Sequence, residues 1–445
     1  MIELRRKIDK TLRNWKSDEK RLPMIVKGAR QIGKTFSIER FGRQNYRSMI
    51  VINFILQPEF RHVFDNGYDV DTIVRNITFI NPELEFVPGE TLLFFDELQQ
   101  CPPCATALKS FAIDGRYDVI CSGSLMGISY NEIESNAVGY KTDVEMFSLD
   151  FEEFLWAKGY DDEHIEPLFG KLCAVEPLTT VEFDVLSELF KDFMVVGGMP
   201  AVVDNYISNG NFSGTLAIQR QLLNDYREDI TKYAAGLDKA KILNVYNHIS
   251  VFLGRDNKKF QISKVARNAR NRDYIGVIDW LASAGIVNPC YCLSVLELPL
   301  KGNYNQDNYK LYFQDTGLLV ASLDEEAQED LRHNRNLGTY KGALYENAVG
   351  DMLRKQGYDL YFYRNDKSTI ELDFIVRDTR SLVPIEVKAG DNTARSLAKV
   401  TDGRVSDIAY GIKMGNQNIG FNGQYYTMPY FLGFMLRRFL RTRNG

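Results

Sequence analysis

The chain has 445 residues, of which 44% are hydrophobic and 25% are charged, and its formal net charge is −5. At roughly 150 residues per domain, this length suggests about three domains. The composition excludes a largely disordered or globally basic protein, so any binding of nucleic acid must be local. Six cysteines are too few for a disulfide scaffold in a chain of this length.

The first residues are charged where a signal peptide would turn apolar, and no apolar run approaches the ~20 residues that a membrane helix needs. We therefore expect a cytoplasmic protein with reduced cysteines and no membrane partner.

The first stretch with recognisable chemistry follows a short apolar run over residues 24–27. It has the spacing Gly-x4-Gly-Lys-Thr of a phosphate-binding loop and leads into a helix-compatible segment. Its residues are Gly28, Ala29, Arg30, Gln31, Ile32, Gly33, Lys34, Thr35 and Phe36. The glycines let backbone N–H groups approach a phosphate, and the N-terminus of the following helix favours anions. We expect this stretch to bind ATP, with Lys34 on the β- and γ-phosphates and the Thr35 hydroxyl on Mg²⁺.

A second apolar run, over residues 91–95, predicts a strand buried on both faces of a parallel sheet. Asp96 and Glu97 follow at its carboxyl end, where ligands bind in open α/β sheets. We expect Asp96 to hold Mg²⁺ through water, and Glu97 to orient or deprotonate the attacking water. A third strand, over residues 117–121, precedes Ser122 and Ser124. Their hydroxyls would contact the γ-phosphate or the attacking water; a simple Ser-Gly turn is the alternative.

The pair Cys101 and Cys104 has a spacing found in redox and zinc sites, but no second Cys/His pair lies nearby. A turn or helix start set by the two prolines between them is the favoured interpretation.

A basic segment lies in the middle of the chain, where residues 255–272 hold seven basic side chains and one acidic one. A predicted helix ending at Gly285 and a strand follow, which is the order of a winged-helix module. We expect this segment to meet DNA phosphates. The alternative is a solvated face on a helical module that contacts proteins.

The second stretch with recognisable chemistry begins with a predicted amphipathic helix over residues 342–353, which carries Glu346 near its start. Strand-like runs follow at 360–364, 371–376 and 382–388, and the polar residues 377–381 predict a hairpin between the last two. Such a hairpin would set Asp373 beside Glu386, with Lys388 on the same face as Glu386. We expect Asp373 and Glu386 to bind Mg²⁺, and Glu346 and Lys388 to complete a catalytic set for phosphodiester cleavage. A solvated Glu–Lys pair is the alternative.

With these motifs in this order, the chain resembles the prokaryotic AAA-type P-loop ATPases fused to a C-terminal domain of unknown function (4143) with a restriction-endonuclease-like fold. The matching segments are 28–35, 94–99, 121–124, 148–155, 197–200, 310–319 and the set from Glu346 to Lys388. By that resemblance Lys34, Thr35, Asp96 and Glu97 are similar to the ATP and Mg²⁺ residues of the family, and Ser122 or Ser124 to its sensor position.

The chain departs from the family pattern at two places. Gly139-Tyr140-Lys141 stands where such proteins often have Gly-Arg, which makes Lys141 the candidate substitute for a basic contact to the γ-phosphate. Leu372 stands where a proline often precedes the aspartate, a change that removes no ligand.

The predicted fold class is α/β in four parts. These are an AAA-like P-loop ATPase domain with a parallel sheet (1–160), a helical lid or linker (161–240), a winged-helix-like module (241–330) and an α/β restriction-endonuclease-like domain (331–445).

The leading functional hypothesis is a Mg²⁺-dependent ATPase coupled to a DNA-facing C-terminal half. One alternative is a nucleotide-gated binding protein whose nuclease-like domain docks DNA or a protein partner without cutting. The other is an active Mg²⁺-dependent DNA nuclease with an ATPase accessory. A protein partner and homo-oligomerisation both stay open.

Overall fold

The computed structural model describes residues 3–124, 137–234, 239–255, 258–265, 269–338, 340–365, 369–388 and 394–443. The chain forms two compact units, one made chiefly of Arg5–Ser148 and the other chiefly of Leu149–Gly445. We call them the N-terminal unit and the C-terminal unit. No described helix is long and apolar enough to cross a membrane.

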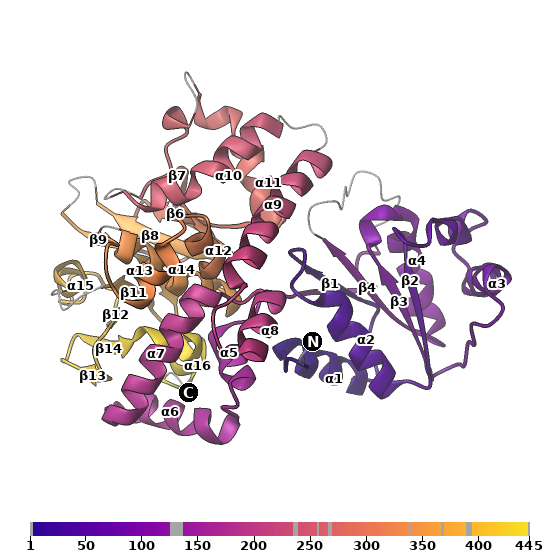
Figure 1. The fold of residues 1–445 in the computed structure, drawn as a ribbon, viewed down its shortest axis with the longest axis horizontal. Coiled ribbons are helices and arrows are strands. Elements are labelled where there is room, and N and C mark those ends of the chain that lie inside the picture. The colour runs from indigo at the N-terminus through magenta and orange to yellow at the C-terminus, as the bar shows by residue number, and fades with distance from the viewer. Residues whose placement is uncertain are drawn as a thin grey trace. The chain divides into compact units, whose positions relative to one another are not determined.

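The N-terminal unit is a parallel five-stranded sheet with strand order β2-β3-β4-β1-β5 and helices on both faces (Figure 1). Its strands are β1 (Met24–Gly28), β2 (Ser48–Asn53), β3 (Thr91–Asp96), β4 (Asp118–Ser124) and β5 (Thr142–Glu145). Its helices are α1 (Lys7–Ser17), α2 (Lys34–Asn45), η1 (Pro58–Phe64), α3 (Val70–Ile80), η2 (Leu98–Gln100) and α4 (Pro102–Asp114). The three strands predicted around the phosphate loop and the acidic pair are therefore β1, β3 and β4.

Alternation along these strands builds the core of the N-terminal unit. Ile50, Leu93 and Phe95 face the side covered by α3 and α4, where they pack with Ile73 and Phe111. All six residues of β3 are buried, as a central strand covered on both faces requires. The order of the strands brings the carboxyl ends of β1, β3 and β4 to one edge of the sheet, where the candidate nucleotide site lies.

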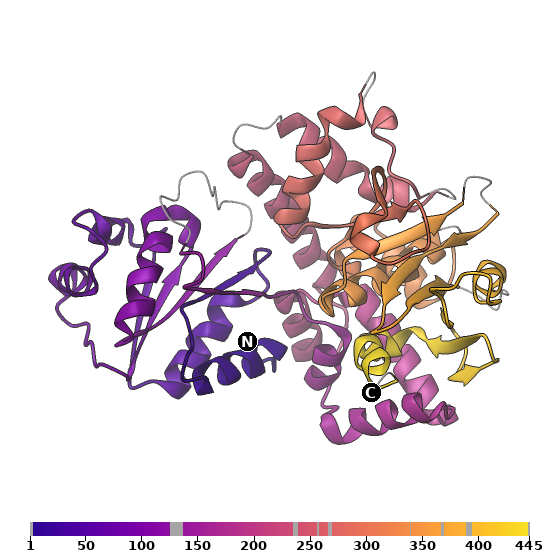
Figure 2. The ribbon, with the colours of Figure 1, turned by 180° about the vertical axis from the view of Figure 1, so that it is seen from behind.

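The C-terminal unit begins with a set of helices (Figures 1 and 2). They are α5 (Phe151–Ala157), α6 (Asp162–Ala174), α7 (Thr180–Val196), α8 (Pro200–Asn209), α9 (Thr215–Tyr233), α10 (Lys239–Leu253), η5 (Ile262–Lys264), η6 (Asn271–Asp273) and α11 (Ile275–Ser283). Leu149, where the main segment of this unit begins, forms two hydrogen bonds: its N–H donates to the carbonyl of Gly198 (2.7 Å), and its carbonyl accepts from Lys355 Nζ (3.0 Å).

Two sheets follow in the C-terminal unit. The first has the order β7-β6-β8-β9 and consists of β6 (Val287–Leu293), β7 (Tyr304–Phe313), β8 (Leu360–Arg364) and β9 (Glu371–Leu372). The second has the order β10-β11-β12-β14-β13 and consists of β10 (Phe374–Arg377), β11 (Leu382–Val387), β12 (Gly411–Gly415), β13 (Gly420–Phe421) and β14 (Tyr425–Pro429). The helices of this part are η7 (Leu300–Gly302), α12 (Thr316–Ala321), α13 (Ala327–Arg332), α14 (Tyr340–Lys355), α15 (Arg395–Val400), η8 (Tyr430–Met435) and α16 (Leu436–Thr442).

The division into two units differs from the four predicted domains. Residues 149–160, predicted to close the ATPase domain, fall in the C-terminal unit, because α5 packs with α7 and η8 and Leu149 is bonded to Gly198 and Lys355. The three predicted parts beyond residue 160 share this unit as well. β6 pairs antiparallel with β7 and parallel with β8, so one sheet spans the predicted boundary at residue 330.

One predicted strand is interrupted. The run 371–376 is split at Asp373 into β9, which pairs with β8, and β10, which pairs with β11. The chain passes from one sheet to the other at this residue.

Candidate nucleotide site and a buried carboxylate cluster

The loop between β1 and α2 has the backbone conformation that its glycines predict. Gly28 has φ +156° and Gly33, which caps α2, has φ +90°. A methyl group at Gly28 would collide with the carbonyl oxygen of Met146, so only glycine fits there. Gln31 also has a positive φ, of +61°. Residues other than glycine rarely adopt a positive φ, and those that do are often found at ligand sites.

Arg6 anchors the phosphate loop through its side chain, a role that the sequence analysis did not predict. Its guanidinium donates to the carbonyls of Ile32 (2.9 Å) and Phe147 (2.6 Å), and the Arg6 side chain is buried. These bonds tie the phosphate loop to the chain that follows β5.

Lys34, on the first turn of α2, points back over the loop. Its Nζ donates to the carbonyls of Gly28 (3.0 Å) and Ala29 (2.7 Å). Burial lowers the pKa of Lys34 to about 8, although the nearby carboxylates of Glu97 and Asp96 oppose that shift. A desolvated cation held by carbonyl oxygens is poised to exchange them for the oxygens of a phosphate.

Asp96, at the end of β3, is the centre of a hydrogen-bond network. Thr35 Oγ1 donates to its Oδ2 (3.0 Å), as does Asn53 Nδ2 (3.0 Å), and Ser122 Oγ donates to its Oδ1. Asn53 ends the neighbouring strand β2, and its role was missed because no local motif marks it. The hydroxyl of Thr35 and the carboxylate of Asp96 are hard oxygen donors, and they fit the requirements of Mg²⁺.

Glu97 directly follows Asp96 in a left-handed backbone conformation, with φ +59°. Its carboxylate accepts a hydrogen bond from Gln99 Nε2, which fixes its orientation. A strained residue next to a candidate metal ligand is the kind of position that catalytic groups occupy.

The other predicted residues near this site are placed differently. The backbone of Ser124 pairs with Gly28, but its side chain lies outside the described part of the structure. Lys141 Nζ forms an ion pair with Asp143 (2.8 Å), which also pairs with Lys27 (2.9 Å), so Lys141 is engaged on the edge strand β5.

The cysteine pair shows the features of buried, inert thiols. Cys101 and Cys104 are buried and free, as is Cys121, and burial raises the pKa of Cys101 to about 11. In the ranges that the structure describes, no group of three or more His, Cys, Asp or Glu side chains is placed to hold a metal ion. The predicted magnesium ligands are smaller sets, namely Thr35 with Asp96 and Asp373 with Glu386.

In the C-terminal unit, the β10–β11 hairpin brings Asp373 beside Glu386. Phe374 pairs with Ile385, so Asp373 and Glu386 are the next opposed positions, and Asp373 Oδ2 accepts a hydrogen bond from the N–H of Val387 (2.8 Å). Glu386 is buried and forms an ion pair with Lys388, with Oε1 and Nζ 2.6 Å apart. Its second oxygen accepts from the N–H of Leu397 (3.2 Å).

Glu346, on α14, is enclosed by three partners that sequence reasoning missed. Its side chain is 2% exposed and forms ion pairs with Lys258 and with Lys310 (3.0 Å), while the Tyr312 hydroxyl donates to it. Burial alone would raise the pKa of Glu346, but the two ammonium groups overcome this and lower it to about 2. Lys310 is 1% exposed, and it also lies 3.4 Å from Glu371.

The charges of Glu346 and of the two lysines that surround it also act on Asp373. Burial and the negative charge of Glu346 raise the pKa of Asp373 to about 7, against the opposing effect of Lys310 and Lys258. The structure therefore brings Glu346, Asp373, Glu386 and Lys388 into one electrostatic cluster. Asp373 and Glu386 are oxygen donors of the kind that Mg²⁺ takes, whereas Glu346 is already neutralised by lysines.

The predicted basic segment is not a uniform surface. Lys258 turns inward to Glu346, and the guanidinium of Arg255 lies 4.3 Å from the ring centroid of Phe252. Lys264, Arg270 and Arg272 are exposed. Asp256 and Arg267 lie outside the described residues.

Comparison with family models assigns three parts of the chain. Residues 20–155 match the AAA domain, residues 187–329 match a domain of unknown function (DUF8612), and residues 341–431 match a domain of unknown function (DUF4143). The predicted AAA-type P-loop domain and the predicted C-terminal domain 4143 are therefore confirmed. Comparison with curated proteins gives no match.

Three solved structures resemble the chain at low identity. A Walker-type ATPase of Pyrococcus abyssi is 14% identical, with 72% of this chain and 96% of that chain covered and a TM-score of 0.44. The ORC2 protein of Aeropyrum pernix, in ADPNP–ADP complexes, is 12% identical, with 75% and 95% covered and a TM-score of 0.36. The ORC1 protein of Aeropyrum pernix, in complex with DNA, is 10% identical, with 75% and 93% covered and a TM-score of 0.26.

Proposed function

We propose that the protein is a Mg²⁺-dependent ATPase that hydrolyses the γ-phosphate of ATP. The observation that carries this proposal is the convergence of Thr35 and Ser122 on Asp96, beside a phosphate loop that ends in Lys34. Lys34 and Thr35 begin the helix that follows β1, Asp96 ends β3 and Ser122 lies near the end of β4. They therefore meet at the carboxyl edge of one parallel sheet, the place where such sheets bind ligands. The match of residues 20–155 to the AAA domain supports the same assignment.

The chain would act by positioning and by neutralising charge. Lys34 exchanges the carbonyls of Gly28 and Ala29 for the β- and γ-phosphates, while the backbone N–H groups of the loop bind the phosphate oxygens. Glu97 orients the attacking water and receives its proton, and Ser122 holds Asp96 in place. Thr35 and Asp96 would hold Mg²⁺, and the ion would supply positive charge next to the phosphates.

ATP hydrolysis by the purified full chain tests this proposal, with Lys34→Ala and Glu97→Gln as variants. We expect Lys34→Ala to lose nucleotide binding, and Glu97→Gln to bind ATP while losing turnover roughly 10²-fold or more. Full turnover in the Lys34→Ala variant would refute the assignment. Duplex and single-stranded DNA are added in parallel, and stimulation by DNA supports a DNA-facing C-terminal half.

We propose as a second candidate that the C-terminal cluster is a Mg²⁺-dependent nuclease site in a restriction-endonuclease-like domain. The placement of Asp373 opposite Glu386, with Lys388 on the same strand end, supports it. Asp373→Asn and Lys388→Ala should each abolish DNA cleavage and leave ATP hydrolysis unchanged. If the wild-type chain cuts no form of DNA with Mg²⁺ or Mn²⁺, this candidate fails.

The remaining alternative is a nucleotide-gated module that docks without cutting. The enclosure of Glu346 by Lys258 and Lys310 favours it, because an acid already neutralised by two lysines is a poor metal ligand. In this alternative, DNA would bind to a winged-helix-like middle region through the exposed basic side chains of the segment 255–272. Otherwise the C-terminal unit would bind a protein or a second copy of the chain. Nucleotide-dependent pull-down with a slow ATPase rate unaffected by DNA is the expected result.

A further inference from the structure

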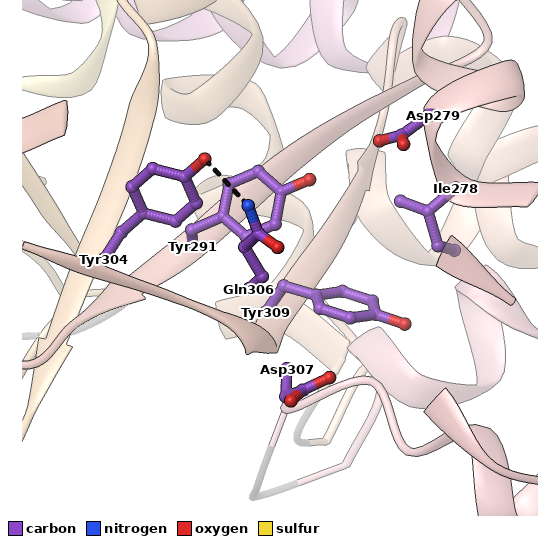
Figure 3. Close-up of a pocket in the computed structure, with 7 residues that line it drawn as sticks. All are labelled: Ile278, Asp279, Tyr291, Tyr304, Gln306, Asp307 and Tyr309. Carbon is purple, nitrogen blue, oxygen red and sulfur yellow. Dashed lines mark hydrogen bonds between the residues drawn. The ribbon is translucent and has the colours of Figure 1, made fainter. Parts of the chain in front are cut away.

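A small pocket lies between α11 and the β6–β7 hairpin, and neither proposed site uses it. Its volume is about 110 Å³, and its walls include three tyrosines and two carboxylates: Tyr291, Tyr304, Tyr309, Asp279 and Asp307. Figure 3 shows the hydroxyls of Tyr291 and Tyr309 directed toward α11, where Asp279 lies. Aromatic rings and acidic groups thus face a common space.

The tyrosines form a connected aromatic wall. The ring centroid of Tyr291 lies 5.1 Å from that of Tyr304 and 6.1 Å from that of Tyr309. Gln306 Nε2 donates to the Tyr304 hydroxyl at 3.5 Å, which braces the outer ring. Burial, and next the charge of Asp279, raise the pKa of Tyr291 to about 12, so its phenol is neutral at physiological pH. The rings therefore offer π faces and phenol oxygens rather than charge.

The charge of the pocket comes from its aspartates. Asp279 and Asp307 are both exposed at the rim, and no lysine or arginine is found among the described residues that line the walls. The pKa of Asp279 is raised by the partial loss of its water, and no charged partner within the described ranges offsets this. Asp279 thus gives this aromatic pocket a negative charge.

We propose that this pocket binds the guanidinium group of an arginine side chain presented by a protein partner. A guanidinium stacks on aromatic faces and donates to carboxylates in the same complex, which an ammonium does less well. The volume is below the ~300 Å³ of typical small-molecule sites, which favours a side-chain head group over a free metabolite. Carboxylates at the rim repel phosphates, so the tyrosines are unsuited to stack the bases of a nucleic acid.

The test is a titration of the full chain with a glycine–serine peptide that carries one arginine, and with the same peptide carrying citrulline. Citrulline keeps the shape of the side chain and lacks its charge, so it isolates the contribution of the cation. Fluorine NMR of 3-fluorotyrosine-labelled protein reports binding at the tyrosines. We expect saturable binding of the arginine peptide, and affinity for the citrulline peptide at least about tenfold lower.

Three variants of the lining separate the contributions. Asp279→Asn should weaken the arginine peptide by roughly three- to tenfold. Tyr291→Leu should do the same, whereas Tyr291→Phe, which keeps the ring, should bind nearly as well as the wild type. Asp184→Asn, at an exposed carboxylate on α7, is the matched control and should change nothing.

Three results would overturn the proposal. They are equal binding of the arginine and citrulline peptides, unchanged affinity in Asp279→Asn, and no saturation of the arginine peptide up to about 20 mM. Binding of single-stranded DNA that is lost in Tyr291→Leu, but gained in Asp279→Asn, would assign the tyrosines to nucleobases instead. Unchanged thermal unfolding of each variant shows that the fold is intact.

Discussion

Thr35 Oγ1 lies 3.0 Å from Asp96 Oδ2, so the first turn of α2 is joined to the end of β3 by a charge-assisted hydrogen bond. The same two oxygens are the proposed ligands of Mg²⁺. Thr35→Val keeps the shape of the side chain and removes the oxygen. We expect the affinity for Mg²⁺–ATP to fall roughly 10- to 100-fold, the usual cost of losing a bond to a charged group.

Titration with a fluorescent ATP analogue, with Mg²⁺ and with EDTA, measures this effect. Thr78→Val is the matched control, because the Thr78 hydroxyl donates to backbone carbonyls of its own helix α3. A Thr35→Val protein that keeps the wild-type difference between Mg²⁺ and EDTA would contradict the assignment of Thr35 as a ligand.

Nucleotide affinity should depend on pH through Lys34. Its pKa in the nucleotide-free protein, about 8, lies below the ordinary value of 10.5, so the side chain loses its proton as pH rises through 8. Phosphates favour the charged form, and binding above pH 8 therefore takes up a proton. We expect the affinity for ATP to fall by up to about tenfold per pH unit above pH 8.

Binding measured from pH 7 to 9.5 tests this prediction, because the phosphates of ATP are already ionised over most of that range. Lys34→Met, which cannot titrate, should bind weakly and with no such slope. A flat wild-type profile through pH 9.5 would show that Lys34 stays charged in the empty loop.

Asp373 should make the protein less stable at neutral and alkaline pH than at pH 4. Its pKa of about 7 in the folded state exceeds the ordinary value of 3.8, so the free energy of unfolding falls as pH rises from about 4 to 7. Asp373→Asn removes this loss. We expect the variant to be more stable than the wild type by on the order of 2–4 kcal/mol at pH 8, and equally stable at pH 4.

Urea unfolding at the two pH values measures the difference. Asp359→Asn, at a half-exposed carboxylate paired with Lys301, should change stability little at either pH. If Asp373→Asn is destabilising at pH 8, the surroundings stabilise the ionised carboxylate. That result would contradict the prediction that the ionised Asp373 lowers the free energy of unfolding.

Gly198 should tolerate no side chain. A methyl group there would collide with the carbonyl oxygen of Leu149, which is backbone and already bonded to Lys355. We expect Gly198→Ala to lower the free energy of unfolding by roughly 2 kcal/mol or more. Gly170→Ala, in the open interior of α6, should raise it by up to about 1 kcal/mol. Similar thermal unfolding of the two variants would show that Leu149 can move aside.

The sequence predicted the local features of both sites well, because each depends on short-range patterns. The loop around Lys34, the buried strand before Asp96 and the hairpin that aligns Asp373 with Glu386 follow from spacing and from the alternation of side chains along strands. Lys258 and Lys310 could not be predicted this way. They lie 88 and 36 residues from Glu346 in the chain, and no local pattern signals a buried ion pair over such separations.

Long-range strand pairing within the C-terminal unit could not be predicted for a similar reason. The order helix, helix and strand that suggests a winged-helix module involves residues that are close in the chain. It does not predict that β6 pairs with β8, which begins more than 60 residues later.

The register of the β10–β11 hairpin fixes more than a hydrogen-bond pattern. A shift of one residue would replace Asp373 with Leu372 or Phe374 opposite Glu386. Phe374 and Ile385 are fully buried, so a misaligned hairpin would have to repack the core around both side chains. The packing of Phe374 against Ile385 thus sets the spacing between Asp373 and Glu386. A substitution that loosens this hydrophobic pair would therefore be observed first as a loss of the chemistry of the two carboxylates.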